Sequence, residues 1–486
     1  MQSAKKIVFV NPPLSIQDRY GVKSQSGGQT PPLGLLCLAT MTRAHGFETT
    51  ILDAAALKLG YAECVSFILD NDFLYVGITA VTISIAHAAE LAARLKKANP
   101  GITVIIGGPH FTALPLETMA MFPQFDIGVI GEADYAIVEL LSALENKKDL
   151  IAVGGLILRR ENGLIKTQPR PRINDLDSLP MPAWDLLPDL ARHYCPPVHT
   201  LKRIPAALLV TSRGCPGECV FCDRSVFGNV LRAYSAEYTF KIIKELYHKH
   251  GIREIQLRDD NFTAYRKRML ELCAMLKAEK LDMVWTCACR VDMVNPDILR
   301  IMKEAGCWQI WYGIESGSDV ILKQIKKHTT ARQIRDAVRM TGEAGISPCG
   351  FFIIGSPGET LETLDETVQF ALDLPLDEAH FSFMTPFPGS QLYARALEYG
   401  SFDNNWNKLN GWLPVFVPHG LTARDLEMYS KRAFRKFYFR PRIIFSYIRK
   451  IRSLRHAAIY FRGFLALLEW LVKSRVNKAG LRQPQE

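Results

Sequence analysis

Three cysteines lie close together near the middle of the chain, Cys215, Cys219 and Cys222, within the segment RGCPGECVFC. Three thiolates on one short loop can bind three irons of a [4Fe–4S] cluster and leave the fourth iron open to an outside ligand. A ligand that binds this iron through an amine and a carboxylate, and that also carries a sulfonium group, can accept an electron into a carbon–sulfur bond of that group. A structural zinc is the alternative, but zinc normally takes four protein ligands. The spacing therefore favours an iron–sulfur cluster.

Six segments rich in apolar and β-branched residues begin at Ala206, and helical segments separate them. The predicted strands are 206–212, 254–258, 283–290, 308–313, 350–355 and 380–384, and the predicted helices include 236–249, 296–304, 331–344 and 361–372. Repeated strand–helix units predict a partial (β/α)6 barrel, which carries its chemistry at the carboxyl ends of the strands. The cysteine loop directly follows the first strand, so it is expected at that rim.

Further short motifs stand at the ends of the later strands. They are DDNF after the second strand, GIES after the fourth, GSPGET after the fifth and PFPGS after the sixth, with Arg290 ending the third. Together with the cysteine loop, these motifs resemble the radical SAM (S-adenosylmethionine) superfamily, and specifically its B12-binding branch, over about residues 5–395. The resemblance implies a [4Fe–4S] cluster on the three cysteines, with SAM as its ligand.

The resemblance also implies which residues contact SAM. The loop after the second strand would meet its amino group, two charged side chains its carboxylate and ribose, and main chain after the fifth strand its adenine. For each residue the alternative is a capping or loop role. The residues expected at the amino group are Asp259, Asp260 and Asn261. Those expected at the carboxylate and ribose are Arg290 and Glu315, and the main-chain segment expected at the adenine is Ile353 to Gly355.

The first 149 residues show a different arrangement of strands and helices. Runs of β-forming residues occur at 7–11, 48–53, 75–80, 103–108 and 126–131, and helical segments such as 34–45 and 86–98 lie between them. Continuous apolar strands joined by helices predict a doubly wound, Rossmann-like parallel sheet that is buried on both faces. Ligands of such sheets bind at the carboxyl ends of the strands.

In the resemblance, this first unit matches the cobalamin-binding-type domain of the same branch. The matching segments are PPLGLLCLATMTRAHG, GGPH and GEADY. None of the 11 histidines has an aspartate two residues before it, so the cobalt-binding Asp-x-His-x-x-Gly motif of B12 mutases is absent. Cobalamin is expected without a histidine ligand from that motif, and the alternative is a domain that only shapes the substrate cavity. The candidate cofactor contacts are Thr79, Ser84, Gly107, Gly108, His110 and Glu132.

The remaining segments are a connector and a basic tail. Residues 150–204 contain two alternating runs around the turn ENG, which predict a hairpin, and then a proline-rich interdomain linker. The barrel is expected over 205–395 and a basic helical region over 396–486. Residues 421–486 hold 16 Lys and Arg against 4 Asp and Glu, so the net charge of +10 belongs to the tail. A charge confined to one end indicates a local anionic partner rather than a nucleic acid.

The tail combines these charges with aromatic and aliphatic residues. Its longest nearly uncharged apolar run, 463–472, is shorter than the roughly 20 residues that a membrane-spanning helix needs. Basic amphipathic helices lying on the cytoplasmic face of an anionic membrane are predicted, and packing on the barrel is the alternative. The expected contacts are Arg449, Lys450, Arg452 and Arg455 with headgroups, and Phe461, Phe464, Leu467 and Trp470 with lipid chains.

Cysteine usage bears on the compartment and on the barrel strands. The N-terminal segment MQSAKKIVFVNPP lacks the regions of a signal peptide, so a reducing cytosol is expected. In that compartment clustered cysteines are more often metal ligands than disulfides. Cys287 and Cys289 alternate with Arg290 along one predicted strand. If Arg290 points into the barrel, both cysteines face the helices and have a structural role.

The expected reaction follows from the resemblance. A reduced cluster would split SAM into methionine and a 5′-deoxyadenosyl radical, which removes hydrogen from an unactivated carbon. With cobalamin carrying a methyl group, the expected outcome is C-methylation of a lipophilic small molecule, with flavodoxin or ferredoxin as the electron donor. One alternative is non-methylating ring closure, as in the anaerobic magnesium-protoporphyrin ester cyclase family. Another is a sensor without turnover, which has no need for the SAM-side motifs.

Overall fold

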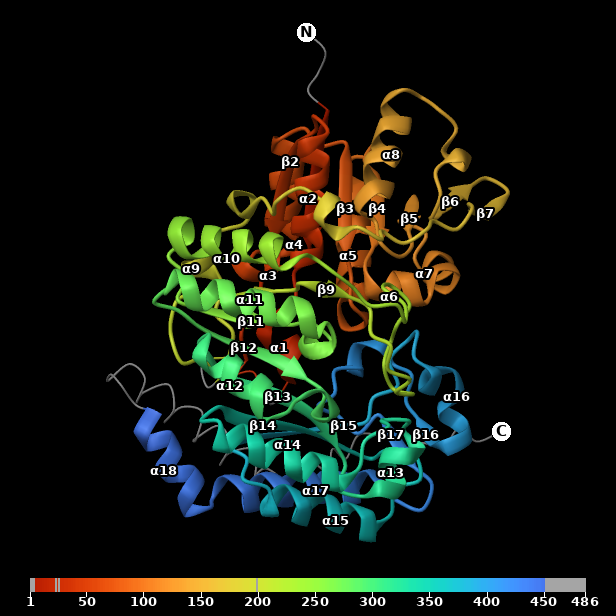
Figure 1. Cartoon of the computed structure of the whole chain (residues 1–486). Helices are drawn as coiled ribbons and strands as arrows, with labels where there is room; N and C mark the ends of the chain where they lie inside the picture. The colour runs from red at the N-terminus through yellow and green to blue at the C-terminus, as the bar shows by residue number, and fades with distance from the viewer. Residues whose placement is uncertain (1–4, 22–23, 25–26, 198–199, 451–486) are drawn as a thin grey trace, which may run out of the picture.

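Two α/β units form the molecule. The computed structural model describes residues 5–21, 24, 27–197 and 200–450. The N-terminal unit lies at the top of Figure 1, and the second unit, with the carboxyl-terminal helices against it, lies below. The predicted α/β fold class, with a Rossmann-like unit followed by a partial barrel and a helical region, is confirmed.

The N-terminal sheet is buried on both faces. It contains β1 (Lys6–Asn11), β2 (Glu48–Asp53), β3 (Tyr75–Thr79), β4 (Thr103–Gly107), β5 (Ile127–Val129), β6 (Leu156–Arg160) and β7 (Gly163–Lys166), in the order β2-β1-β3-β4-β5-β6-β7. The first five strands are parallel, as predicted. Ile7 and Phe9 share a core with α2 (Leu33–Ala44) and α8 (Asp134–Glu145). Val8 and Val10 share another with α4 (Tyr61–Asp70) and α5 (Ile85–Ala98), because side chains alternate along a strand.

The hairpin predicted within 150–204 is present, but it belongs to the N-terminal sheet. Strand β6 pairs antiparallel with β5, and β7 pairs with β6. Leu156, Ile157 and Leu158 of β6 are all buried, so the hairpin extends the core of the first unit. An alternating pattern predicts a hairpin but does not say which strand it pairs with. The chain therefore leaves the N-terminal sheet after Lys166, and the predicted proline-rich linker follows the hairpin.

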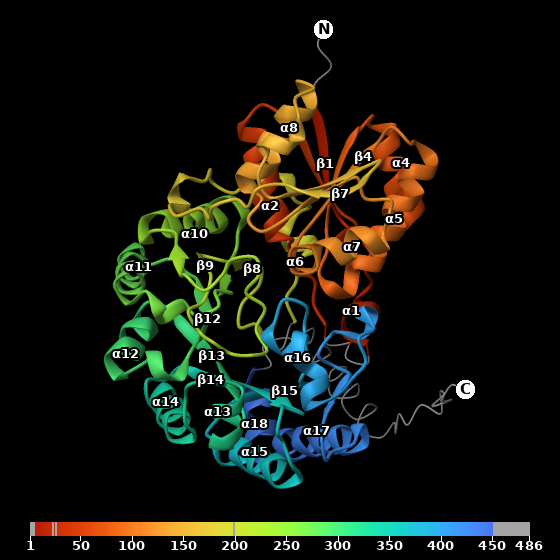
Figure 2. The same ribbon diagram turned by 90° about the vertical axis from the view of Figure 1, so that its right-hand side faces the viewer.

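The second sheet is parallel throughout and curls into a half-barrel. It contains β8 (Ala206–Leu209), β11 (Glu254–Leu257), β12 (Val284–Cys289), β13 (Cys307–Glu315), β14 (Ser347–Ile354) and β15 (Glu378–Phe383), which pair in chain order. These strands match the six predicted ones. Figure 2 shows the connecting helices on the outer, convex side of the curled sheet. They are α10 (Ala236–His250), α11 (Arg266–Glu279), α12 (Pro296–Glu304), α14 (Ala331–Glu343) and α15 (Leu361–Asp373).

The region after the barrel contains a small sheet that the sequence did not predict. Helix α16 (Gln391–Tyr399) is followed by an antiparallel pair, β16 (Gly400–Phe402) and β17 (Phe416–Pro418). Strands of three residues are too short to show an alternating pattern, so the prediction of loop and helix alone was wrong here. Helix α17 (Ala423–Tyr438) then buries Leu426, Ala433 and Phe437 in the barrel core.

The last described helix, α18, spans Pro441–Lys450. The predicted membrane contacts Arg452, Arg455, Phe461, Phe464, Leu467 and Trp470 lie outside the described residues, as do the side chains of Arg449 and Lys450. Within the described part of the chain, no helix is long and apolar enough to cross a membrane. The first part of the predicted tail, α17, therefore packs on the barrel, and the membrane prediction concerns the residues beyond it.

Candidate active site

The cysteine loop begins at a glycine whose conformation other residues rarely adopt. After β8, the chain forms β9 (Ser212–Arg213), which pairs antiparallel with β10 (Arg232–Ala233). Gly214 follows with φ +86°, and a Cβ there would collide with the carbonyl oxygen of Val230. The Cys215 amide donates to the Gly228 carbonyl at 3.4 Å. Only glycine fits this turn without strain, so Gly214 sets the direction in which the loop leaves the sheet.

The other half of the loop is held by main-chain bonds to distant segments. The Val220 amide donates to the Ile325 carbonyl at 3.1 Å, and the Leu392 amide donates to the Val220 carbonyl at 2.8 Å. Val220 and Phe221 also pack on a small apolar core that includes Met384. The loop is therefore anchored to segments that follow β13 and β15, and the three cysteines lie at the carboxyl-terminal rim, as predicted.

Two cations lie beside the three thiols. The Arg290 guanidinium donates to the Lys327 carbonyl at 3.0 Å and pairs with Asp292 at 3.0 Å. Lys327 Nζ, in turn, pairs with Glu315 Oε1 at 2.7 Å, and both residues are buried. A hydrogen bond with Cys222, together with the charges of Lys327 and Arg290, lowers the pKa of Cys219 to about 6. Cys219 thus favours the thiolate form that binds iron, whereas the same hydrogen bond raises the pKa of Cys222.

Lys327 was not predicted as a site residue. It stands in the polar run Lys326-Lys327-His328, which in sequence is typical of a solvated turn. Lys326 and His328, on either side of Lys327, have positive φ angles of 52° and 54°. The resulting turn brings Lys327 close to the cysteine loop. Glu315 also has a positive φ, 66°, at the end of β13. Such conformations are rare outside glycine and cluster at functional sites.

The predicted SAM-contacting loop after β11 divides into two environments. The Asp259 carboxylate accepts hydrogen bonds from the Thr211 amide and hydroxyl, both at 2.5 Å, and is buried. Asp259 therefore braces the strand that leads into the cysteine loop. Asp260 is exposed, and Asn261 is buried with its Oδ1 accepting from the Arg290 amide at 3.4 Å.

The rim of the barrel carries buried polar atoms that fit a polar ligand. Asn261 Nδ2 and Ser356 Oγ are buried and have no hydrogen-bond partner in the part of the chain that the structure describes. Buried polar atoms are costly when left unpaired. The amino, carboxylate and ribose groups of SAM supply suitable partners, so these residues fit the predicted ligand.

The predicted adenine segment ends in a turn that a buried glutamate organises. Glu359 accepts hydrogen bonds from the amides of Gly355 and Ser356, at 2.5 and 2.9 Å. Burial raises the pKa of Glu359 to about 8. Gly355 has φ +89°, and Ile353 packs beside Phe221 of the cysteine loop. The segment from Ile353 to Gly355 is therefore next to the loop, as the SAM prediction requires.

A cavity of about 470 Å³ separates the N-terminal sheet from the first barrel strand. It is lined by five predicted cofactor contacts, Thr79, Ser84, Gly107, Gly108 and Glu132. Gly34 and Gly131 also line it, and a Cβ at either position would meet no atom within 4 Å. Open main chain at a sheet edge suits a ligand with many amide groups, because it offers donors and acceptors at close range. The residues present therefore fit cobalamin.

The opposite wall of this cavity comes from the barrel unit. Leu209 and Val210 precede the cysteine loop, and Phe227 follows it, and all three line the cavity. A ligand in the cavity would thus lie against the segments that carry the three cysteines. These three side chains are apolar, which limits the access of water to a ligand beside them, while the charged Arg213 also lines this wall.

A buried ion network joins the two units at the edge of the cavity. Arg213 pairs with both carboxylate oxygens of Asp134, at 2.9 and 3.0 Å, and approaches Glu132 at 3.4 Å. Arg232 also pairs with Glu132. All four residues are buried. The carboxylates follow β5 and the arginines flank the cysteine loop, so the network sets the position of the loop relative to the N-terminal sheet.

His110, also a predicted cofactor contact, lies outside the cavity wall. Its Nδ1 is 3.2 Å from Thr82 Oγ1, and its ring meets that of Trp406 edge-on at 4.4 Å. Burial lowers the pKa of His110 to about 4. The histidine therefore packs between the N-terminal unit and the region after the barrel.

We expect His110 to make the fold sensitive to acid. Its folded pKa lies below the unfolded value of about 6.5, so the unfolded chain gains the proton first as pH falls. The stability that depends on neutral His110 is complete above pH 6.5 and is lost as pH falls through 4, by about 3 kcal/mol. His110→Phe should flatten this part of the curve of unfolding free energy against pH. An unchanged slope in urea titrations would show that His110 does not titrate on unfolding.

The prediction for the cysteines of β12 is confirmed. Cys287 and Cys289 are buried with their sulfurs 3.5 Å apart. Both lie in the core between the sheet and its outer helices, near Tyr312, whose hydroxyl bonds Thr341 of α14. They therefore face away from the barrel interior.

Comparison with known proteins agrees with these two sites. Residues 209–371 match the radical SAM superfamily, and residues 21–141 match the B12 binding domain. An uncharacterized methyltransferase of Pyrococcus horikoshii is 36% identical over 90% of this chain and 94% of its own length. The anaerobic magnesium-protoporphyrin IX monomethyl ester cyclase of Rubrivivax gelatinosus is 27% identical over 89% of this chain and 77% of its own.

The fold is shared with a solved enzyme. The radical S-adenosylmethionine methyltransferase TsrM from Kitasatospora setae superposes with a TM-score of 0.70 over 90% of both chains, at 16% identity. The cofactors of such a fold are a [4Fe–4S] cluster, SAM and cobalamin, for which the cysteine loop, the rim and the cavity are suited. This chain belongs to the radical SAM superfamily, in the branch whose members carry a B12-binding domain.

Proposed function

We propose that this enzyme transfers a methyl group to a carbon atom of a lipophilic small molecule. The observation that carries the proposal is the cavity between the units. Its one wall holds the predicted cobalamin contacts Thr79, Gly107 and Gly108, and its other wall leads directly into the cysteine loop. A methyl donor in this cavity and a radical source on the adjoining loop would be near enough to act on the same substrate carbon without releasing it.

Residues of the chain would bind the cofactors and shield the reaction from water. When bound, the cluster supplies an electron, SAM a radical that removes hydrogen, and cobalamin a methyl group, which a second SAM restores. Cys215, Cys219 and Cys222 would hold three irons of the cluster, and the charges of Arg290 and Lys327 favour the thiolate of Cys219. The apolar wall around Phe227 excludes water and protects a substrate radical from side reactions. A flavodoxin or ferredoxin is the proposed electron donor.

Labelled SAM tests the reaction directly. Reconstituted enzyme with cobalamin, reductant, SAM carrying a deuterated methyl group and a cell lipid extract should form 5′-deoxyadenosine and S-adenosylhomocysteine. Mass spectrometry should then find a lipid that carries the deuterated methyl group. Formation of 5′-deoxyadenosine with no labelled lipid and no S-adenosylhomocysteine would favour non-methylating ring closure, which the similarity to the cyclase makes the second candidate. Absence of both nucleosides would favour a sensor.

The lipophilic substrate is inferred from the basic tail. Residues 421–486 carry 16 Lys and Arg, and α18 exposes Ile444 and Phe445 next to Arg442. A peripheral membrane contact through this region would bring the enzyme to an isoprenoid lipid or a tetrapyrrole held in the bilayer.

We expect the enzyme to sediment with vesicles that contain anionic lipid. Binding should weaken as salt is raised, because screening reduces the attraction between basic side chains and headgroups. Truncation after Lys450 should abolish binding. It should leave the barrel folded, because the shortened chain keeps α17, which packs on the barrel. Neutral vesicles are the control. Equal recovery of the full-length and truncated forms in the supernatant would contradict a membrane contact of the tail.

A further inference from the structure

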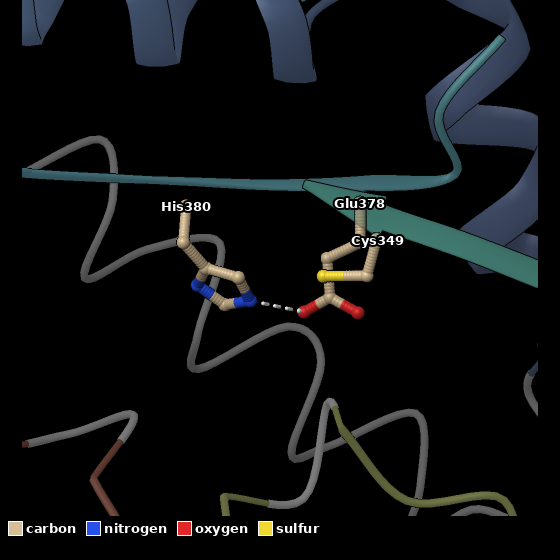
Figure 3. A group of neighbouring side chains, drawn as sticks. All are labelled: Cys349, Glu378 and His380. Atoms are coloured by element: carbon tan, nitrogen blue, oxygen red, sulfur yellow. Dashed lines mark ion pairs between the residues drawn. The ribbon is translucent and has the colours of Figure 1, made fainter. Parts of the chain in front are cut away.

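Three side chains of metal-ligand type meet inside the barrel, away from the cysteine loop. Cys349 of β14 and Glu378 of β15 are register partners on neighbouring parallel strands. His380 follows Glu378 by two residues, so it lies on the same face of the sheet. Figure 3 shows all three side chains on one side of the two strands. Their ligand atoms all lie within 4.8 Å of one another, and His380 Nε2 is 3.1 Å from Glu378 Oε1.

This face is the concave interior of the half-barrel. Gln309 of β13 donates to Glu378 Oε2 at 3.3 Å, although β14 lies between the two strands. Arg258, directly after β11, stacks on Trp311 of β13 at 3.7 Å, across β12. Side chains of non-adjacent strands can touch in this way only on the concave side of a curled sheet.

We propose that Cys349, Glu378 and His380 bind one Zn²⁺ ion, separate from the iron–sulfur cluster. Thiolate, carboxylate and imidazole are the three donor types that zinc takes in proteins, at about 2.0–2.3 Å from the metal. A zinc with three protein ligands keeps its fourth position for water or for a substrate oxygen. The ligand class expected at that position is an oxygen of a carboxylate, phosphate or alcohol.

Charge supports a divalent ion at this place. Glu378 is fully buried, and Cys349 is buried beside it. A carboxylate and a thiolate carry two negative charges, which one Zn²⁺ balances to give a neutral group. A neutral complex is much less costly to bury than separate charges. The ion would lie between His380 Nε2 and Glu378 Oε1, which are 3.1 Å apart.

Outer contacts hold two of the three ligands in position. The Gln309 amide that donates to Glu378 also accepts from Trp311 Nε1 at 2.7 Å, so its orientation is determined. The ring of Phe351 stacks on that of His380 at 4.8 Å with an angle of 15° between the planes. Partners of this kind orient metal ligands and affect metal affinity.

The proposed zinc site lies closer to the amino-terminal ends of β14 and β15 than the predicted SAM segment does. Cys349 stands four residues before Ile353 on the same strand, and His380 stands two before Ser382, the register partner of Ile353. A zinc ion there would face the interior of the barrel on the side away from the cysteine loop. It is therefore placed to hold a polar group of a molecule bound within the barrel.

Metal analysis of the holoenzyme tests the proposal. After anaerobic reconstitution the cluster occupies the cysteine loop, so added Zn²⁺ reports on other sites. Treatment with one equivalent of Zn²⁺ and gel filtration should leave one zinc per chain. Glu378→Gln, which preserves size, and His380→Ala should each lose it. Gln309→Ala should weaken binding by about 10- to 100-fold, as expected for an outer contact.

Cobalt gives a spectroscopic readout of the cysteine ligand. In a variant with serine at all three loop cysteines, one equivalent of Co²⁺ should give a near-ultraviolet band from sulfur-to-cobalt charge transfer. Cys349→Ser should remove this band, whereas Cys273→Ser, at a buried cysteine of α11, should keep it. Circular dichroism confirms that each variant is folded.

Two outcomes would overturn the proposal. One is a folded holoenzyme that retains no zinc, and the other is full zinc retention in both Glu378→Gln and His380→Ala. The production of 5′-deoxyadenosine is measured separately. A failure of the zinc site therefore leaves the proposed methyl transfer untouched, and the reverse also holds.

Discussion

Replacing Cys219 with alanine is expected to remove the [4Fe–4S] cluster and, with it, all reductive cleavage of SAM. A cubane held by three thiolates loses a required ligand, and Cys219 is the thiol whose pKa the site lowers to about 6. The anaerobically reconstituted variant should lack the iron content and the visible absorption of the cluster. Assays with dithionite and SAM should then yield no 5′-deoxyadenosine above a reaction without enzyme.

Cys273→Ala is the matched control for this variant. Cys273 is also buried, but it packs in α11 against Met269, with the two sulfurs 3.9 Å apart. The Cys273→Ala variant should retain the normal iron content and cleave SAM at the normal rate. Full iron content and normal 5′-deoxyadenosine formation in Cys219→Ala would show that the assignment of the cluster ligands is wrong.

Arg213→Met should destabilise the protein strongly. The substitution removes the partner of Asp134 while that carboxylate stays buried, and an uncompensated buried charge costs about 3–5 kcal/mol. The loss should appear as a lower urea midpoint, measured by tryptophan fluorescence with the cofactors absent. Because Arg213 lies at the start of the cysteine loop, cluster incorporation should fall as well.

Two further variants separate charge from structure. Arg43→Met breaks an exposed pair with Asp185 and should cost no more than about 1 kcal/mol. The double variant Arg213→Met/Asp134→Leu replaces both charges with apolar groups and should recover much of the lost stability. A midpoint for Arg213→Met equal to that of Arg43→Met would contradict a structural role of the buried network.

Most of the fold could be predicted because local patterns determine it. Strands such as β4 and β1 are mainly apolar runs, and helices such as α14 begin at a capping residue, Thr330, whose side chain accepts from the Gln333 amide at 3.3 Å. The cysteine loop carries its chemistry in three residues that are close in sequence. Patterns of this kind do not depend on distant parts of the chain.

The unpredicted features depend on contacts between distant segments. Lys327 becomes a buried partner of Glu315 only through an unusual turn, and polar runs normally indicate solvent exposure. Asp259 stands in the expected motif, yet its carboxylate bonds Thr211, which no spacing rule reveals. The hairpin β6–β7 was predicted, but its partner β5 was not, because strand pairing is decided by the whole sheet.

The cavity between the two units also has a consequence for assembly. Because both units form its walls, a cofactor bound in the cavity contacts both of them and favours their closed arrangement. Occupancy and closure are then linked equilibria, and a ligand present at 100 times its dissociation constant adds about 2.7 kcal/mol to the closed state. Protein without cobalamin would lack this contribution, so its two units would be held together less tightly.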